Sequence, residues 1–534
     1  MKRYYVTLFL SLISTLAFAQ QQPTLPLQTL MEVEYPNSNY ELGTGMLGLG
    51  DINSDGKPDF AVSAGNIGKT FIYYGGKGVL DSTVDLVIKG GGIMAKGDLN
   101  GDGAMDLVVL HPADSTTGYL NQLAIYFGRK DSTIKLDTIP DIIITDPAGA
   151  GVPYETRFGR TFAIGDLNGD GFDDLVVGAP DYGLTTGKVY VYYGKTNFNG
   201  IADATAEGDT VGTYYGYNIK IADINGDGIK DLAISSDSRV MDGGFLDIYY
   251  GKKGWQFTKN GYNQRFDKTN TRLQRYNAFG LVDVNADGKT DISITQGDSA
   301  YFFYGRSDSI RHKPDFVLTN PDTSFYRGFF GFANDIGDIN NDGKPDFAMR
   351  LDPGTGLSAC MAVYLGNSTP QTRPIGDRCK YGKNPFDIIV NVGDVNGDGV
   401  NDFGSVSPYE QFSQDGYFII FKGDSAYVTT SVKQHPKQIP KEFKLIQNYP
   451  NPFNPSTIIR WQLAVHSQVT LTIYDVTGRE ITTLVHEEEP AGVHKIRFNA
   501  GKYNLSSGVY FARLKVLDKN NVRNAQTIKL TVLK

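Results

Sequence analysis

The chain alternates short apolar runs with polar, glycine-rich segments over most of its length. In one representative unit an apolar run at 158–164 precedes an acidic loop, and further runs follow at 175–177 and 188–193. A fourth run is clearest in other units, at 141–145 and 315–318. Short runs rich in Val, Ile, Tyr and Phe and bounded by turn residues predict β-strands. The pattern therefore predicts repeated units of four short strands.

Every unit carries the same acidic loop, Asp-x-Asn-x-Asp-Gly-x-x-Asp. Successive loops start 47 to 68 residues apart, at Asp51, Asp98, Asp166, Asp223, Asp283, Asp338 and Asp394. A second marker, an aromatic or apolar run that ends in glycine such as Tyr192-Tyr193-Gly194, follows each of the seven loops, in degenerate form at Phe421-Lys422-Gly423. Units of this kind are typical of β-propeller blades, whereas the coils of a parallel β-helix are much shorter. The sequence predicts an all-β chain with a seven-bladed β-propeller at 20–432 and no room for an eighth blade.

A ring of blades needs a strand from one terminus to complete its last blade. The segments 29–35 and 427–432 both have a strand pattern. Because 29–35 resembles the fourth strands of other units, we expect the N-terminal segment to close the ring.

The units resemble FG-GAP repeats, the family that builds the seven-bladed propeller of integrin α-subunits. Phe158-Gly159 and Gly178-Ala179-Pro180 around the third loop match the residues that give the family its name. Phe279-Gly280 and Phe330-Gly331 keep the first half of the motif, and the resemblance covers roughly residues 28–432. In this family the cation loops lie on one face of the propeller, and partners usually bind the other face.

The residue types of the loop point to calcium. A hard cation takes six to eight oxygen ligands, and glycine at position 6 permits the sharp turn that wraps a short loop around it. Three carboxylates and a carboxamide, without histidine or cysteine, favour Ca²⁺ over softer metals, and a flexible loop disfavours Mg²⁺. Side chains 1, 3, 5 and 9, a carbonyl at position 7 and water would complete the shell. The sequence thus predicts up to seven structural Ca²⁺ ions.

The predicted metal ligands are Asp51, Asn53, Asp55, Asp59, Asp98, Asn100, Asp102, Asp106, Asp166, Asn168, Asp170, Asp174, Asp223, Asn225, Asp227, Asp231, Asp283, Asn285, Asp287, Asp291, Asp338, Asn340, Asp342, Asp346, Asp394, Asn396, Asp398 and Asp402.

Two other interpretations of the loop compete with calcium binding. Asp, Asn and Gly favour turns without any metal, but three carboxylates within nine residues would then repel one another. An EF-hand needs a bidentate acid at position 12 and a following helix. Position 12 is small or apolar, for example at Val62, Val109 and Val177, so the EF-hand is excluded. Position 2 is always aliphatic, and we expect it to turn inward and hold the loop on its blade.

The first residues have the pattern of a secretory signal. Lys2 and Arg3 precede a mostly apolar stretch at 4–16 and the small-x-small site Ala17-Phe18-Ala19. This pattern predicts a signal peptide at 1–19 and no transmembrane span in the mature chain.

The net charge bears on which partners the chain can bind, and the cysteines bear on the redox state of its compartment. The net charge of −8 comes without a basic stripe, so no nucleic-acid partner is expected. The two cysteines, Cys360 and Cys379, would lie in an oxidising compartment. A disulfide between them and two free buried thiols both stay open.

The sequence after residue 432 is of a different kind. The segment 433–442 is polar and proline-bearing and predicts a linker, and 443–534 alternates as a small β-sandwich. The run Tyr449-Pro450-Asn451-Pro452-Phe453 and the later Gly508-Val509-Tyr510-Phe511 closely resemble the C-terminal sorting domain of type IX secretion cargo in Gram-negative bacteria. The resemblance implies export by the Sec route and handling by the type IX secretion machinery. The destination is then secretion or the outer cell surface, typically with loss of this domain.

Two classes of function stay open. We favour a non-catalytic surface protein that binds an extracellular protein or glycan, because the propeller holds only His111 and His312, far apart, and no nucleophile motif. The alternative is a secreted propeller enzyme that acts on polysaccharide.

Candidate ligand residues lie in the segments that enter the first strand of each unit. Tyr and Arg are enriched at binding hot spots, although packing between blades explains them equally well. The candidates are Tyr154, Arg157, Tyr214, Arg275, Tyr276, Tyr326 and Arg327. A second candidate surface is the insert 252–271, with Trp255, Phe257, Tyr262 and Phe266.

Overall fold

The chain divides into two compact units, Met1–Thr429 and Thr430–Lys534, and each has its own hydrophobic core. The predicted signal peptide and the predicted linker 433–442 lie outside the residues that the structure describes. The computed structural model describes residues 27–34, 42–78, 80–111, 121–129, 136–149, 156–237, 244–269, 271, 279–296, 299–319, 331–351, 360–368, 376–379, 388–407, 416–427, 443–449, 451–463, 467–489, 492–503, 505–518 and 523–533.

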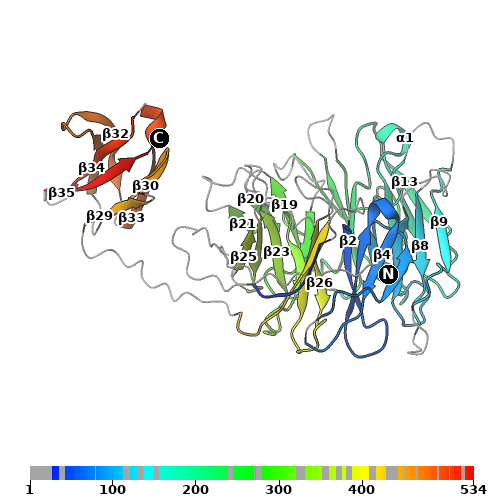
Figure 1. Ribbon diagram of the computed structural model, residues 1–534. Coiled ribbons are helices and arrows are strands. Elements are labelled where there is room, and N and C mark those ends of the chain that lie inside the picture. Colours follow the sequence, from blue (N-terminus) through cyan, green and yellow to red (C-terminus); the bar gives the residue numbers. More distant parts are fainter. Residues whose placement is uncertain are drawn as a thin grey trace. The chain divides into compact units, whose positions relative to one another are not determined.

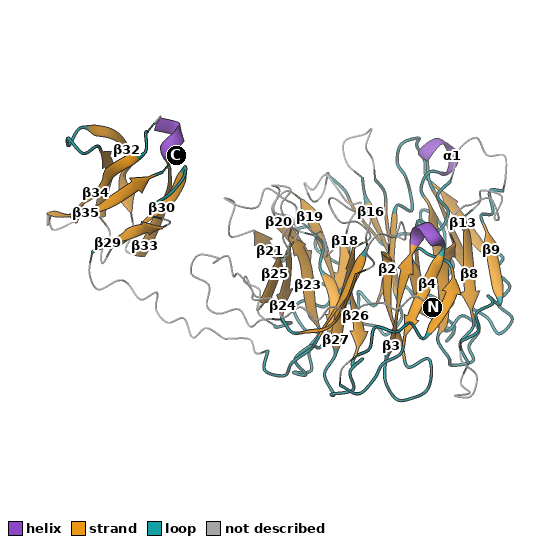
Figure 2. Cartoon of the chain, viewed as in Figure 1, coloured by secondary structure: helices purple, strands orange, loops and turns teal. Residues whose placement is uncertain are grey.

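The first unit contains seven four-stranded antiparallel sheets, which we number as blades 1 to 7 in the order of their acidic loops (Figures 1 and 2). Blade 1 contains β2 (Leu42–Gly50), β3 (Asp59–Ala64), β4 (Lys69–Tyr73) and β5 (Leu86–Lys89); blade 2 contains β6 (Met94–Gly97), β7 (Asp106–His111), β8 (Gln122–Tyr126) and β9 (Ile142–Thr145). Blade 3 contains β10 (Thr161–Gly165), β11 (Asp174–Ala179), β12 (Lys188–Tyr192) and β13 (Ala204–Glu207); blade 4 contains β14 (Asn218–Ala222), β15 (Asp231–Ser235), β16 (Leu246–Tyr249) and β17 (Gln264–Phe266). Blade 5 contains β18 (Phe279–Val282), β19 (Asp291–Gln296), β20 (Ser299–Phe303) and β21 (Phe316–Thr319); blade 6 contains β22 (Asn334–Gly337), β23 (Asp346–Leu351), β24 (Cys360–Tyr364) and β25 (Gly376–Cys379). Blade 7 contains β26 (Ile388–Gly393), β27 (Asp402–Ser407), β28 (Tyr417–Phe421) and β1 (Thr29–Glu34). Two short turns, η1 (Gly65–Ile67) and α1 (Tyr182–Thr185), connect strands in blades 1 and 3.

The blades form a closed ring. The first strands of successive blades contact one another in chain order, from β2 through β6, β10, β14, β18 and β22 to β26, and β26 contacts β2 again. We call these seven the inner strands. Ring closure is completed by β1, which pairs antiparallel with β28 from Thr29 opposite Phe421 to Glu34 opposite Tyr417. The prediction of an N-terminal closing strand is confirmed, and so is the seven-bladed all-β fold.

The core of the propeller lies in the seams between blades. Buried side chains gather in clusters that each draw on two neighbouring blades, such as Val108 and Leu123 of blade 2 with Leu175 and Val177 of blade 3. Because both faces of each blade meet a neighbour, the second strands are mostly buried, and β11 is buried at every position. This explains why 175–177 reads as an unbroken apolar run rather than an alternation.

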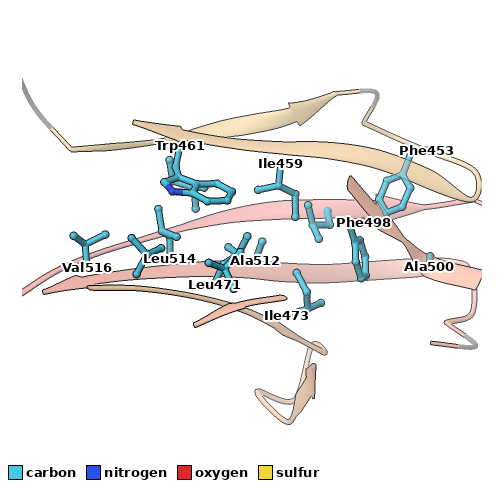
Figure 3. Packing of buried hydrophobic residues seen from close by; sticks show 14 of the residues in the cluster. Phe453, Ile459, Trp461, Leu471, Ile473, Phe498, Ala500, Ala512, Leu514 and Val516 are labelled. Carbon is cyan, nitrogen blue, oxygen red and sulfur yellow. The ribbon is translucent and has the colours of Figure 1, made fainter. Parts of the chain in front are cut away.

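The second unit is a small β-sandwich, as its alternating pattern predicts. A three-stranded sheet contains β29 (Lys444–Tyr449), β30 (Ser456–Leu463) and β33 (Gly492–Asn499). A four-stranded sheet contains β32 (Glu480–Glu489), β31 (Ser467–Tyr474), β34 (Gly508–Asp518) and β35 (Arg523–Val532), and the turn η2 (Ala500–Tyr503) follows β33. Figure 3 shows side chains from both sheets meeting in one apolar layer, with Trp461 and Ile459 on one side and Leu471 and Leu514 on the other.

Across the described ranges, the helical turns are all too short, and too weakly apolar, to cross a lipid bilayer.

Candidate metal loops

Each acidic loop joins the first strand of a blade to the second. Position 9 is the first residue of the second strand in all seven blades, as Asp174 is in β11. A strand therefore follows every loop, which agrees with the exclusion of an EF-hand. The aliphatic residue at position 2 is buried in six loops and half-buried at Ile52, so it does anchor the loop on its blade.

Two positions in each loop adopt the left-handed backbone conformation. Position 6, glycine in every copy, has φ between +80° and +92°, as expected for the sharp turn. Position 4 is also left-handed in every copy, with φ of +69° at Gly169 and +58°, +57° and +59° at Ser54, Ala286 and Asn341. The sequence analysis missed this requirement, although glycine at position 4 in four of the seven loops was a signal for it.

The carboxylates at positions 1 and 5 hold the loop backbone in shape. In all seven loops the position 1 carboxylate accepts a hydrogen bond from the position 6 amide, at 2.7–3.0 Å. The position 5 carboxylate likewise accepts a bond from the position 7 amide, at 2.7–3.1 Å. Both carboxylates thus accept bonds from amides of their own loop. The Oδ2 atom of the position 1 carboxylate, which accepts the position 6 amide, retains a second lone pair for another partner.

The position 9 carboxylate has a second role that the sequence analysis did not foresee. Asp174 is fully buried, and its two oxygens accept bonds from the Leu167 amide at 3.1 Å and the Gly194 amide at 2.9 Å. Gly194 ends the aromatic marker after the third strand of the blade. The equivalent glycine amide bonds to the position 9 carboxylate in every blade, at 2.8–2.9 Å. Position 9 therefore ties the loop to the end of the third strand, which explains why the two sequence markers occur together.

Burial raises the pKa values of the position 9 carboxyl groups. Desolvation raises the pKa of Asp174 to about 7, and the negative charges of Asp170 and Asp166 add to the rise, against the two amide bonds. The pKa values of Asp291 and Asp346 rise to about 8 for the same reasons. A cation beside the three carboxylates of a loop would reverse this repulsion.

The loop side chains fit a hard cation in chemistry. In the third loop, Oδ1 of Asn168 at position 3 is buried without a hydrogen-bond partner, so it is an acceptor still to be satisfied. Side chains 1, 3, 5 and 9 are the groups that would hold the ion, and an oxygen-only set suits Ca²⁺. Within the described ranges, however, no three His, Cys, Asp or Glu side chains converge as closely as ligands of one ion do. Here the loop oxygens bond to loop amides.

Backbone carbonyls of the loops also accept hydrogen bonds from the neighbouring blade. The position 1 carbonyl of Asp166 accepts a bond from the Lys230 amide of blade 4 at 3.0 Å, and the Leu167 carbonyl accepts one from Lys252 at 3.2 Å. The same relation closes the ring, because the Val395 carbonyl of blade 7 accepts a bond from the Gly76 amide of blade 1 at 2.9 Å. The shape of a loop therefore affects two blades.

On the opposite face, the structure describes two of the seven candidate ligand residues. Arg157 and Tyr214 lie before β10 and β14, and both have left-handed φ values, +53° and +49°. Arg157 is half exposed and pairs with Asp181 at 2.9 Å. The remaining candidates, Tyr154, Arg275, Tyr276, Tyr326 and Arg327, lie outside the described residues.

The second candidate surface, the insert 252–271, is wrong as a ligand surface. Trp255 and Phe257 are 6% and 5% exposed, and Phe266 is fully buried in β17. Trp255 and Phe257 pack on Tyr249 of β16, with ring centroids 6.3 and 5.4 Å apart. Trp255, Phe257 and Tyr262 pack at the seam between blades 3 and 4, and Phe266 packs at the seam between blades 4 and 5, so these aromatic residues serve the core.

Comparison with known proteins finds family matches in both the propeller and the C-terminal domain. Residues 158–192 match the FG-GAP repeat, residues 51–109 the FG-GAP-like repeat, and residues 447–529 the secretion system C-terminal sorting domain. The chain is 27% identical to integrin alpha-V of Gallus gallus over 252 residues, which is 42% of this chain and 23% of that protein. It is 37% identical to phosphatidylinositol-glycan-specific phospholipase D of Rattus norvegicus over 156 residues, 27% of this chain and 18% of that protein. The chain thus spans less than a quarter of these relatives.

A solved structure titled "Crystal structure of BBS1N in complex with ARL6DN, soaked with lead" is 11% identical, with a TM-score of 0.40, over 74% of this chain and 96% of that one. This likeness is too weak to carry an argument. The matched segments show that the chain combines FG-GAP repeats with a type IX sorting domain. It is therefore handled by that secretion system and is secreted or placed on the outer surface of the cell.

Proposed function

We propose that this protein is a calcium-stabilised β-propeller that binds an extracellular protein or glycan and does not catalyse a reaction. The ions are structural, up to one in each of the seven loops. The orphaned Oδ1 of Asn168 and the three carboxylates of the same loop support a cation in the third loop. The other six loops repeat its residues and backbone shape.

The binding proposal rests on a group of strained backbone residues that lie close together around blades 3 and 4. Among the described residues, the non-glycine positions with left-handed φ outside the acidic loops are Arg157, Leu184, Thr185 and Tyr214. Such residues cost on the order of 1–3 kcal/mol each and gather at binding sites, where the surroundings hold them in place. All four belong to segments that enter a first strand or join a second strand to a third. In an antiparallel meander that is the face opposite the loops.

These strained residues form one connected surface. The Thr185 carbonyl accepts bonds from the amides of Gly212, at 3.2 Å, and Tyr214, at 2.9 Å, and Asp181, which pairs with Arg157, begins the same turn. Leu184 and Val211 stand exposed beside it, at 54% and 57%. We call Arg157, Asp181, Leu184, Thr185, Val211 and Tyr214 the blade 3–4 rim.

Binding without turnover separates this proposal from the polysaccharide-degrading alternative. The secreted protein, assayed with calcium, is expected to bind members of a glycan array or a cell surface and to leave a polysaccharide panel undegraded. Release of reducing ends from any polysaccharide would favour the enzyme instead.

The double substitution Leu184→Asp with Val211→Asp tests the blade 3–4 rim directly. It is expected to abolish binding, since it places two charges on an exposed apolar pair. The matched control is Ile201→Asp, because Ile201 is 67% exposed but lies between β12 and β13, on the loop face. Equal loss of binding in the control, or full binding by the double variant, would contradict the assignment.

A further inference from the structure

The inner strands carry few charges. Their seven described sequences contain only Lys96, Lys220 and Asp335. Asp335 accepts a bond from the Gly337 amide at 2.8 Å, and Asn391 does the same for Gly393 at 2.9 Å, so Asp335 has a local backbone role. Lys96 lines a small cavity with Leu49 and Met105 at the seam between blades 1 and 2. The third charged residue, Lys220, has neither of these surroundings.

The Lys220 side chain contacts a residue that precedes the first strand of blade 6. Its Nζ lies 4.5 Å from the centre of the Phe332 ring. Lys220 belongs to blade 4 and Phe332 precedes β22 of blade 6, and blade 5 lies between them in the ring. Blades that are not neighbours meet on the side of the inner strands that faces the axis. The ammonium group therefore lies on the axial side of blade 4.

The ammonium group of Lys220 has a cation–π contact but no anionic partner among the described residues. No carboxylate of those residues forms an ion pair with it, and burial lowers its pKa to about 8. The side chain nevertheless keeps some contact with water. An aromatic face attracts the positive charge but accepts none of its three N–H donors in the way an oxygen does. The site therefore offers donors to an oxygen-bearing anion that reaches the axis.

We propose that the ring axis binds a small oxyanion group, a carboxylate or a sulfate, through the ammonium of Lys220, with Phe332 packed against the lysine. A negative charge there would restore the solvation that the ammonium loses inside the ring. The inference stands apart from calcium binding and from the blade 3–4 rim.

The rate of lysine acylation measures the occupancy of this site without any substitution in the sequence. The full chain, with calcium held constant, is treated with an acetylating reagent in chloride, sulfate or acetate at equal ionic strength, and each lysine is followed by mass spectrometry. Sulfate, acetate or both are expected to slow the acylation of Lys220 several-fold relative to chloride, and the difference between the two anions identifies the preferred group. The exposed Lys253 is the internal control and should react equally in all three salts. Equal rates at Lys220 in all three salts would overturn the proposal.

A pair of variants gives an independent readout. Sulfate raises the melting temperature of proteins in general, so the informative quantity is the difference between variants. Lys220→Met keeps an unbranched side chain against Phe332 and should lose part of the sulfate-dependent rise, whereas Lys253→Met should keep all of it. If both variants respond to sulfate as the unmodified protein does, Lys220 holds no anion.

Discussion

The two units of this chain use the same kind of aspartate turn in opposite electrostatic settings. In the sandwich, the single carboxylate of Asp475 accepts bonds from the Thr477 amide at 2.9 Å and from the Arg479 amide and Nε, both at 3.0 Å. These donors, the Thr477 hydroxyl foremost, lower the pKa of Asp475 to about 2. In the propeller, burial and two neighbouring carboxylates raise the pKa of Asp174 to about 7. The Asp475 turn has one carboxylate and pairs it with Arg479. The third loop holds three carboxylates and no ion pair among the described residues, whereas in the seventh loop Lys422 pairs with Asp398 at 2.8 Å.

The units also differ in what holds them together. The sandwich has one apolar core, in which Trp461 and Phe498 are almost completely buried. The propeller divides its core among blade seams, and the acidic loops of blades 2, 3, 4, 6 and 7 add backbone bonds to the next blade. Stability should therefore depend on calcium in the propeller and be independent of it in the sandwich.

The largest single-residue effect is expected at the sandwich core. Trp461→Ala should destabilise the second unit by about 4 kcal/mol, as removal of a buried aromatic side chain does. Calorimetry of the full chain should show that transition lowered and the propeller transition unchanged. A shift of both transitions would show that the two units do not unfold independently.

A slightly smaller effect is expected in the propeller from Asp174→Ala. The change leaves the Leu167 and Gly194 amides without their acceptor inside the protein. Two orphaned buried donors cost about 2–6 kcal/mol, and we expect about 3 kcal/mol after local relaxation. Chemical denaturation followed by propeller fluorescence measures it. A loss below about 1 kcal/mol would show that the position 9 tie is dispensable.

A disulfide in blade 6 would stabilise the propeller and not the sandwich, since both cysteines of the chain belong to the propeller. The register places Cys360 of β24 directly opposite Cys379 of β25. Directly paired residues of antiparallel strands have Cα atoms about 4.5–5.5 Å apart, within the range of disulfides. We predict a disulfide in the secreted protein, whose reduction lowers propeller stability by about 2–3 kcal/mol. Two titratable thiols in the denatured, unreduced protein would contradict it.

The smallest effect is expected at position 5 of a loop. Asp170 is exposed, and its bond to the Phe172 amide is local. Asp170→Asn should change stability by less than about 0.5 kcal/mol in a chelator, as surface substitutions usually do. In calcium it should lower the melting temperature measurably, because one ligand charge is lost. Equal effects in both buffers would mean that position 5 does not contact an ion.

The fold followed from the sequence because two local markers repeat seven times. The loop motif, the run ending in glycine and the strand pattern each fix a piece of every blade. What the sequence did not show depends on contacts between distant residues. The bond from Gly194 to Asp174 joins residues twenty positions apart, so position 9 looked like a metal ligand alone. The aromatic residues of 252–271 looked like a surface because composition does not reveal that Trp255 turns back onto Tyr249.

Calorimetry of the full chain in calcium and in excess chelator tests the central claim most directly. Ions that bind only the folded propeller raise its stability by mass action. The account predicts that removal of calcium lowers the propeller transition markedly, that added calcium restores it, and that the sandwich transition stays in place. A propeller transition at the same temperature in calcium and in chelator would contradict the claim that the seven loops are structural calcium sites.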